Sequence, residues 1–359
     1  MKKIVKKFTI ILNLIAATAL LIAYSSVYIS PAKFWIPAIV GLAYPYILFL
    51  NFVFILYWLF STSRMALLSI AIILIGYSHL KDYFQLKSVK TDKKGIVVCS
   101  YNVKNFIGIS DTVKKTNNVT SIMNYLRSKN PDIVCMQETN SASIKGFNPI
   151  LNKKGAPDKN MQTTADQHDS PIIFSRYPIV KKGKIRFEET SNMIVFADIK
   201  IDEDTFRIYS CHLQSFRFTS QDINSLDEIS IEDQEKNIKE FHLFGSKLKR
   251  AFIKRTEHAN KLRENIDHCP YPVIVCGDFN DTPVSYTYRT VRGHDLKDAF
   301  VESGTGIGNS YLGRLPSFRI DYILHSSDFT GYNFTVDRVT YSDHYPVSCK
   351  LIRNTDPLN

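Results

Sequence analysis

The hydrophobic pattern divides the chain into an apolar amino-terminal part and a longer part in which short apolar runs alternate with polar ones. Residues 8–29 and 34–60 carry no charged side chain, and residues 65–80 form a third, shorter apolar run. A helix needs about 20 apolar residues to cross a bilayer, so the first two runs are long enough. The third can span if flanking side chains reach the interface. We therefore predict a membrane anchor of about three transmembrane helices over residues 1–80, followed by a polar linker over residues 81–94.

The first apolar run is also compatible with a cleaved signal peptide. That alternative is disfavoured, because the run has no clear small-residue cleavage site and two further apolar runs follow it. Trp35 and Trp58 are the only tryptophans, and on a helix they lie about 35 Å apart, which suits the two aromatic belts of a bilayer. The sequence therefore predicts a multi-pass membrane protein in contact with the lipid bilayer.

Positive charge is concentrated in the same amino-terminal part. Of the net charge of +11, residues 1–90 contribute +8 and residues 91–359 contribute +3. The near-neutral remainder lacks the basic surface of a tight duplex-DNA binder, which weakens a nucleic-acid substrate without excluding it. Lysines at positions 2, 3, 6 and 7 mark the cytoplasmic end. Three crossings then place the rest of the chain on the non-cytoplasmic face, which is periplasmic or extracellular in a bacterium.

Residues 95–354 have the alternating pattern of one α/β domain. Apolar runs bounded by polar residues predict strands, and periodic apolar residues predict helices between them. The predicted strands are Gly95–Tyr101, Asp132–Met136, Pro171–Phe174, Met193–Ile201, Thr205–Cys211, Pro272–Cys276, Arg319–Leu324, Val336–Thr340 and Pro346–Leu351, with a hairpin over Val180–Phe187. Helices are predicted over residues 111–129, over Glu235–Ile266 and in the second half of Thr290–Phe300. We interpret the basic residues of the long helix as a solvated face, and the six cysteines as buried free thiols.

Polar side chains follow the ends of several predicted strands. The clearest case is Tyr271–Thr282, in which a buried strand stops at Gly277 and is followed by Asp278 and Asn280, on one side of the chain. The full set of such residues is Asn102, Glu138, His212, Asp278, Asn280, Asp321, Asp343 and His344. Carboxylates bind Mg²⁺ or Mn²⁺, amides donate to phosphoryl oxygens, and histidines supply an acid and a base for metal-assisted hydrolysis. The absence of a thiol from this set argues against zinc.

Asp321 has a predicted partner. It lies between Ile320 and Tyr322 in a predicted strand, so alternation points it away from these apolar neighbours. A buried carboxylate needs a charged or hydrogen-bonding partner, because leaving it unpaired is costly. We therefore predict a pair between Asp321 and His344, which follows the next strand.

The order of the motifs resembles one family. The motifs are Ser-Tyr-Asn, Met-Gln-Glu, Ser-Arg-Tyr-Pro, Cys-His-Leu, Gly-Asp-Phe-Asn-Asp, Arg-Ile-Asp-Tyr-Ile-Leu and Ser-Asp-His-Tyr-Pro-Val. They resemble the successive motifs of the endonuclease/exonuclease/phosphatase superfamily, which includes deoxyribonuclease I, abasic-site endonucleases, inositol polyphosphate phosphatases and neutral sphingomyelinases. The resemblance covers roughly residues 95–352. It implies a four-layer α/β sandwich of two mixed β-sheets flanked by helices, and a metal-dependent phosphoester hydrolase.

The resemblance also implies a metal site and a water-activating group. Glu138 would be the principal ligand of Mg²⁺ or Mn²⁺, with Asn102 beside it, and Asp343 would complete the site. Asp278 would position or activate the attacking water, and Asn280 would hold a phosphate oxygen.

The histidines and arginines receive roles in the same way. His344 would contact the phosphate or take a proton, oriented by Asp321. His212 matches the second catalytic histidine of deoxyribonuclease I and the sphingomyelinases, with Asp166 or Asp169 as candidate acidic partners. Arg176 and Arg314 are candidate contacts for the substrate phosphate, whereas Arg319, inside a strand, is assigned a structural role.

Two substrate classes remain open. One is a nucleic-acid phosphodiester. The other is a phospholipid, by resemblance to neutral sphingomyelinase or an inositol phosphatase, and the predicted anchor favours it. A catalytically silent, membrane-tethered binding module is a third hypothesis, which the set of eight candidate residues disfavours. No protein partner is implied.

Overall fold

The chain forms two compact units, each built from segments that are distant in sequence. The computed structural model describes residues 2–61, 63–107, 118–139, 162–163, 171–219, 221–222, 224, 234–313 and 317–354. The first unit comprises Met1–Tyr83, Phe216–Glu257 and Asp281–Thr290. The second comprises Phe84–Ser215, His258–Asn280 and Val291–Asn359. The amino-terminal apolar segment therefore shares its unit with two pieces from the carboxyl-terminal half of the chain.

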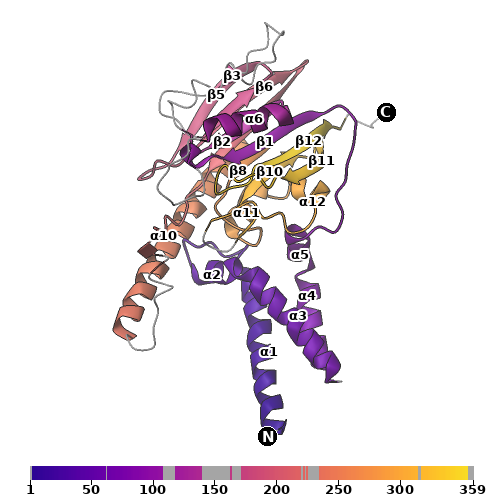
Figure 1. The fold of residues 1–359 in the computed structure, drawn as a ribbon, viewed down its shortest axis with the longest axis vertical. Helices are drawn as coiled ribbons and strands as arrows, with labels where there is room; N and C mark the ends of the chain where they lie inside the picture. The colour runs from indigo at the N-terminus through magenta and orange to yellow at the C-terminus, as the bar shows by residue number, and fades with distance from the viewer. Residues whose placement is uncertain are drawn as a thin grey trace. The chain divides into compact units, whose positions relative to one another are not determined.

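Two six-stranded sheets form the second unit (Figure 1). One has the order β11-β12-β1-β2-β4-β3 and the other β5-β6-β7-β8-β10-β9. The strands are β1 Ile96–Asn102, β2 Ile133–Gln137, β3 Gln162–Thr163, β4 Ile172–Ser175, β5 Ile179–Arg186, β6 Met193–Ile201, β7 Asp204–His212, β8 Val273–Asp278, β9 Leu296–Asp298, β10 Asp321–Ser326, β11 Phe329–Val336 and β12 Val347–Arg353. In each sheet one central pair is parallel, β1 with β2 and β7 with β8, and the other paired neighbours are antiparallel. The two mixed sheets that the resemblance implies are thus present.

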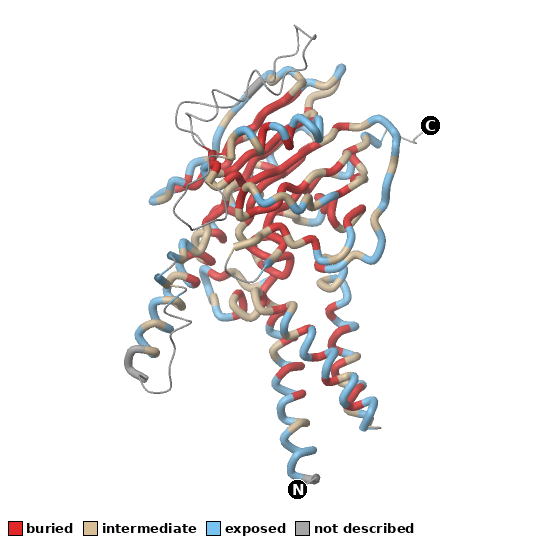
Figure 2. The backbone as a smooth tube through the Cα atoms, viewed as in Figure 1, coloured by how far each residue is buried: buried red, intermediate tan, exposed pale blue. Residues whose placement is uncertain are grey.

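Apolar side chains from both sheets form a common core, and helices cover the outer faces. Val98 and Cys135 of one sheet share a cluster with Ile208 and Cys276 of the other. The central strands are almost continuously buried in Figure 2. The helices that follow are η1 Lys104–Phe106, α6 Val119–Lys129, α10 Gln234–Asp267, α11 Tyr286–Arg292 and α12 Ala299–Ser303. Figure 1 shows α6 over β1 and β2, and Leu126 belongs to a buried cluster with residues of those strands. The arrangement is the expected helix–sheet–sheet–helix sandwich.

Three expected elements differ from the observed ones. The strand expected at Val336–Thr340 lies earlier in the chain. It is β11, which begins at Phe329 and ends at Val336, where its pairing with β12 stops. The hairpin expected over Val180–Phe187 is a single strand, β5, whose register with β6 shifts between Ile179 and Lys181. Its Gly183 lies under the Phe196 ring, where an added Cβ would approach within 2.3 Å, so this glycine allows close packing and not a turn. The helix expected late in Thr290–Phe300 gives way to β9, which pairs with β10.

Apolar helices make up most of the first unit. They are α1 Lys2–Ser25, α2 Ile36–Leu42, α3 Tyr44–Phe60, α4 Ala66–Ile75 and α5 Tyr77–Tyr83. In the described part of the chain, one helix, Ile4–Ser25, is long and apolar enough by itself to cross a membrane. The pair α2–α3, bent by 65°, and the pair α4–α5, bent by 70°, meet the same criteria only when each is taken as one interrupted span.

Buried polar side chains connect three of these helices. Asn13 of α1 donates to Ser69 of α4 (2.8 Å) and accepts from the Trp58 indole of α3 (2.9 Å). Ser69 in turn donates to Asn51 of α3 (3.1 Å). All four side chains are fully buried. Such groups are expensive in an apolar surrounding unless they pair with one another, so the network fixes how α1, α3 and α4 pack.

Residues 281–290 pack with the apolar helices of the first unit. Val284 is buried in a cluster with Tyr44 and Leu48 of α3. Its carbonyl oxygen accepts a hydrogen bond from the Ser26 hydroxyl (3.1 Å). Gly41 approaches so closely that an added Cβ would lie 2.7 Å from the same carbonyl oxygen. A loop that follows β8 is therefore an integral part of the first unit.

Candidate active site

Strand directions bring the polar residues to one edge of each sheet. In the first sheet the parallel pair β1 and β2 ends with Asn102 beside Gln137. In the second, the parallel pair β7 and β8 ends with His212 beside Asp278. β10 runs antiparallel to β8, so its first residue, Asp321, pairs with Asp278. Carboxyl ends of parallel strands and amino ends of their antiparallel neighbours thus coincide, which explains why strand ends collect the candidate residues.

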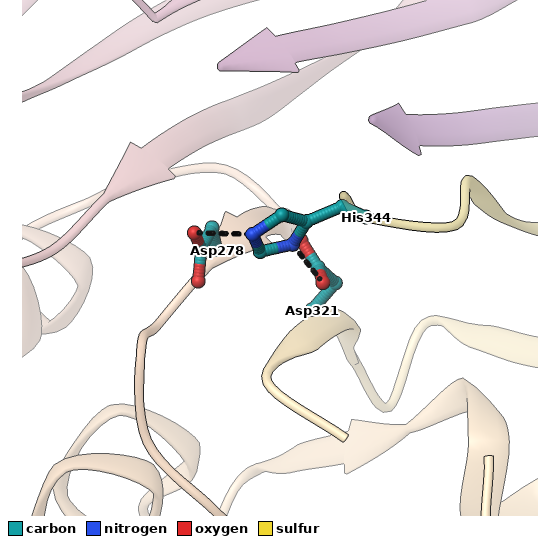
Figure 3. Close-up of side chains that lie close together, drawn as sticks. All are labelled: Asp278, Asp321 and His344. Atoms are coloured by element: carbon teal, nitrogen blue, oxygen red, sulfur yellow. Dashed lines mark hydrogen bonds and ion pairs between the residues drawn. The ribbon is translucent and has the colours of Figure 1, made fainter. Parts of the chain in front are cut away.

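Asp278, Asp321 and His344 form a buried cluster (Figure 3). His344 Nδ1 lies 2.8 Å from Asp321 Oδ2, and His344 Nε2 lies 3.7 Å from Asp278 Oδ2. The three residues are each 5% exposed or less. The contact between Asp321 and His344 that strand alternation predicts is therefore confirmed. One imidazole bridges two carboxylates.

The electrostatics of this cluster follow from burial and from the two negative charges. Burial alone would lower the pKa of His344, but the carboxylates of Asp321 and Asp278 outweigh it and raise the pKa to about 10. Burial raises the pKa of Asp278 to about 7; the His344 charge opposes this rise and the Asp321 charge adds to it. In the metal-free protein at neutral pH, His344 is cationic and suited to contact an anion. Asp278 titrates near neutrality, where a group that takes up and releases a proton works best.

Asn102 extends the cluster to Glu138. Its amide Nδ2 donates to Asp278 Oδ2 (3.0 Å) and to Glu138 Oε1 (3.1 Å), while its Oδ1 accepts from the backbone of Lys104 (3.0 Å). The orientation of this amide is thereby fixed by three partners. His212 Nε2 lies 3.5 Å from Glu138 Oε1. Six of the predicted residues consequently form one connected network.

The backbone is unusual at two of the predicted positions. Glu138 has φ +50° and Asn280 has φ +54°, in the left-handed region that non-glycine residues seldom occupy. The Glu138 carbonyl accepts a hydrogen bond from the backbone of Asn105 (2.7 Å), which holds this conformation. The Asn280 backbone N–H donates to Asp278 Oδ1 (2.8 Å), and its side chain donates to the carbonyl of Leu213 (3.1 Å). Left-handed conformations held by such contacts cluster at functional sites.

The remaining predicted residues are placed differently. Asp343 pairs with Lys104 (2.9 Å). Arg176 donates to Asn130 (2.5 Å) and lies 3.7 Å from Asp132, which precedes β2. The structure therefore puts Arg176 at the opposite end of β2 from Glu138, and does not bring it to the network. Arg314, Asp166 and Asp169 lie outside the described residues.

Arg319 has the structural role expected of it. Its guanidinium is buried, lies 2.7 Å from the buried Asp298 carboxylate and stacks on the rings of Phe300 and Tyr322. Asp298 also accepts a hydrogen bond from the Phe300 N–H and so caps α12. The ion pair therefore connects the segment before β10 to the end of β9 and the start of α12.

Sequence reasoning did not identify the buried polar residues that hydrogen-bond to the network or join the two sheets beside it. Gln137 is fully buried, and its amide donates to Ser210 in the other sheet (3.1 Å) and contacts Ser100 in its own (3.4 Å). The Ser342 hydroxyl donates to the Asn102 carbonyl (2.8 Å), and the Ser310 hydroxyl accepts from the Asp321 N–H (3.1 Å). A glutamine directly after the predicted strand Asp132–Met136 was the available signal, since a buried amide requires partners.

The residues fit a divalent cation. Glu138, Asp278 and Asp321 bring three carboxylates into the network, and Asp321 Oδ1 is buried without a hydrogen-bond partner among the described residues. Ligand atoms of Asp278, Asp321 and His344 all lie within 4.8 Å of one another. Oxygen donors of this kind suit hard cations such as Mg²⁺. An additional positive charge would also offset the buried negative charge.

Comparison with known families agrees with the motifs. The profile of the endonuclease/exonuclease/phosphatase family matches residues 99–344. A second profile, described as a domain of unknown function (DUF8431), matches residues 6–83. Comparison with curated protein sequences gives no match.

Solved structures share the fold of the second unit. TDP2 from D. rerio, in complex with a single-strand DNA product, superposes with a TM-score of 0.51 at 18% identity, covering 73% of this chain and 100% of that one. A mannosyl-6-phosphatase from Bacteroides thetaiotaomicron gives a TM-score of 0.50 at 17% identity, covering 72% of this chain and 99% of that one. At these identities the likeness concerns the fold. The family profile spans more than half of the sequence, and the chain therefore belongs to the endonuclease/exonuclease/phosphatase family.

Proposed function

We propose that the chain is a divalent-metal-dependent phosphodiesterase that is tethered to a membrane. The observation that carries this proposal is the buried cluster of Asp278, Asp321 and His344, connected through Asn102 to Glu138. Hydrolysis of a phosphoester needs a base for water, a cationic contact for the phosphate and ligands for a metal. Family membership supports phosphoester hydrolysis as the reaction class, because relatives in the family act on phosphoesters.

The chain's own residues divide these tasks. Glu138 and Asn102 would hold Mg²⁺ or Mn²⁺, and Asp343 would join them on leaving Lys104. When bound, the metal would stabilise negative charge on the phosphoryl oxygens. Asp278, with a pKa near neutrality, would take the proton of the attacking water.

The histidines and amides would contact the substrate. His344 would hold a phosphate oxygen as a cation, oriented by its bond to Asp321. His212 lies close to Glu138 and would serve as the second acid–base group. Asn280 stays a candidate phosphate contact, as does Arg314. Arg176, at the opposite end of β2, is not assigned this role.

Metal dependence gives the direct test of the proposed function. The full chain in detergent is expected to hydrolyse bis-para-nitrophenyl phosphate, to lose turnover with EDTA, and to regain it with Mg²⁺ or Mn²⁺. The monoester para-nitrophenyl phosphate serves as the control for diester preference. Unchanged turnover after EDTA treatment and dialysis would exclude a metal-dependent reaction.

The substrate could be nucleic acid or phospholipid. D. rerio TDP2 has been seen with a DNA product, which favours the first as a class for the fold. The apolar first unit favours the second, since it would hold the enzyme at a lipid surface. Parallel assays of the full chain with single-stranded DNA, RNA, sphingomyelin and phosphoinositides distinguish the two.

We propose further that residues 1–80 cross the membrane three times, that residues 81–94 are a linker, and that residues 95–354 lie on the non-cytoplasmic face. The two bent helix pairs and the polar network that joins α1, α3 and α4 support three crossings. An alkaline phosphatase fusion at residue 95 is then expected to be active, and a fluorescent-protein fusion there dark. The reverse pattern would mean that residues 65–80 do not span.

A further inference from the structure

The first unit contains a groove that lies outside the catalytic network. It is formed between Trp35 and α10 and has a volume of about 430 Å³. Its lining residues are Trp35, Phe241, His242, Gly245, Ser246 and Lys249. The groove therefore combines aromatic walls with an amine, an imidazole and a hydroxyl.

Two neighbouring stripes of α10 explain why the groove exists. Phe244, Leu248 and Phe252 follow each other at intervals of four and pack in a cluster with Ala38 of α2. That cluster holds the helix beside the residues that follow Trp35. Phe241, Gly245 and Lys249 form the adjacent stripe, which lines the groove. The stripe of Phe244, Leu248 and Phe252 is thus buried by packing, whereas the stripe of Phe241, Gly245 and Lys249 lines the groove.

Gly245 lines the groove. It lies inside a long helix, where glycine destabilises relative to alanine, so its presence calls for a reason. A Cβ built at Gly245 meets no atom within 4 Å. Packing among the described residues therefore does not require glycine here. The missing side chain instead leaves space between Trp35 and the helix.

Exposed apolar side chains and basic residues surround the groove. Phe241 is 55% exposed, and Ile238, one turn earlier, is 61% exposed. Residues 237–254 carry five Lys or Arg against a single Glu. Exposed aromatic and aliphatic side chains beside a cationic face are typical of helices that lie in the headgroup layer. Trp35 immediately precedes α2, one of the apolar helices of the same unit.

We propose that this groove binds an anionic phospholipid of the bilayer in which the first unit is anchored. Lys249 would pair with the lipid phosphate at the rim, and Trp35 and Phe241 would contact the glycerol and upper acyl chain. The basic residues of α10, which the sequence suggested were a solvated face, would then face anionic headgroups. This inference rests on the proposed membrane anchoring but not on the proposed phosphodiesterase activity, because none of these residues belongs to the catalytic network.

Quenching of tryptophan fluorescence by brominated lipids tests the proposal on the full chain. Vesicles contain phosphatidylcholine and phosphatidylglycerol, and either lipid alone carries bromine at equal mole fraction. Brominated phosphatidylglycerol is expected to quench more strongly, with a preference of about fivefold, the factor that one lysine near an anionic surface provides. Trp35→Phe should remove this excess, because Trp58 is buried among α1, α3 and α4.

Three further variants locate the lipid in the groove. Gly245→Leu should fill it and abolish the excess quenching, whereas Gly245→Ala is the matched control and should retain it. Lys249→Gln, which alters neither shape nor helix propensity much, should abolish the excess as well. Equal quenching by the two brominated lipids overturns the proposal, as does an excess that survives both Gly245→Leu and Lys249→Gln.

Discussion

The Glu138→Gln variant is expected to lose divalent-metal binding and phosphodiester hydrolysis together, with turnover lowered by at least about 10²-fold. The substitution keeps the size and most hydrogen bonding of the side chain but removes its charge. Glu138 accepts a hydrogen bond from Asn102 and lies close to His212. It is more exposed than the buried cluster of Asp278, Asp321 and His344. Calorimetric titration with Mn²⁺ and turnover of bis-para-nitrophenyl phosphate measure the two losses on the same preparation.

A matched control separates charge at the site from charge elsewhere. Glu188→Gln removes the same charge from an exposed position after β5, and should leave both measurements unchanged. Thermal unfolding of Glu138→Gln in EDTA should match that of the unsubstituted chain. If the variant keeps EDTA-sensitive turnover, Glu138 is not a metal ligand.

The second large effect concerns Asp321 and His344. Asp321→Asn is expected to lower kcat by roughly 10²-fold or more, the range in which acid–base groups contribute. The reason is the 2.8 Å contact between Asp321 Oδ2 and His344 Nδ1, which orients the imidazole and keeps it charged. Because the two residues act as one unit, adding Asp321→Asn to His344→Ala should cost little more. Losses that multiply would show that Asp321 acts elsewhere, most simply on the metal.

The same pair predicts a pH dependence in EDTA. The pKa of His344 in the folded chain is raised from 6.5 to about 10. Because the folded chain holds the His344 proton more tightly than the unfolded chain, protonation of His344 stabilises the fold. This stabilisation is complete below pH 6.5 and is lost as the pH rises towards 10. The melting temperature of the unsubstituted chain should therefore fall between these pH values, and that of Asp321→Asn should fall less. Equal slopes would mean that Asp321 does not hold the proton on His344.

Alternation and strand ends were sufficient to predict much of this arrangement. Asp321 was predicted to contact His344 because it lies between two apolar residues of a strand, and the contact is present. Asn102, Glu138 and Asp278 lie at or just after the carboxyl ends of strands. These strand ends meet, so the three side chains are in contact although they are far apart in the sequence. Local patterns work here because a strand's alternation and end fix where its side chains lie.

Other features depend on contacts that no local pattern carries. Arg176 follows a strand just as Glu138 does, yet β4 runs antiparallel to β2, so its end lies at the opposite edge. A hairpin was expected over Val180–Phe187, but the segment is a single strand in which Gly183 packs against Phe196 of the neighbouring strand. The grouping of Phe216–Glu257 with the amino-terminal helices likewise rests on tertiary packing. Strand direction and long-range partners, and not propensity, decided these cases.

The packing of Val284 limits which parts of the chain can be removed. Val284 is four residues beyond Asn280, and it is held by Ser26 and by side chains of α3. The amino-terminal helices therefore hold in place the segment that follows Asn280. They are not a detachable tether. A soluble truncation that starts after residue 83 would strip the cover from this stretch and from the α10 segment that packs on Ala38. Activity measurements should therefore use the whole polypeptide, kept in detergent or a bilayer.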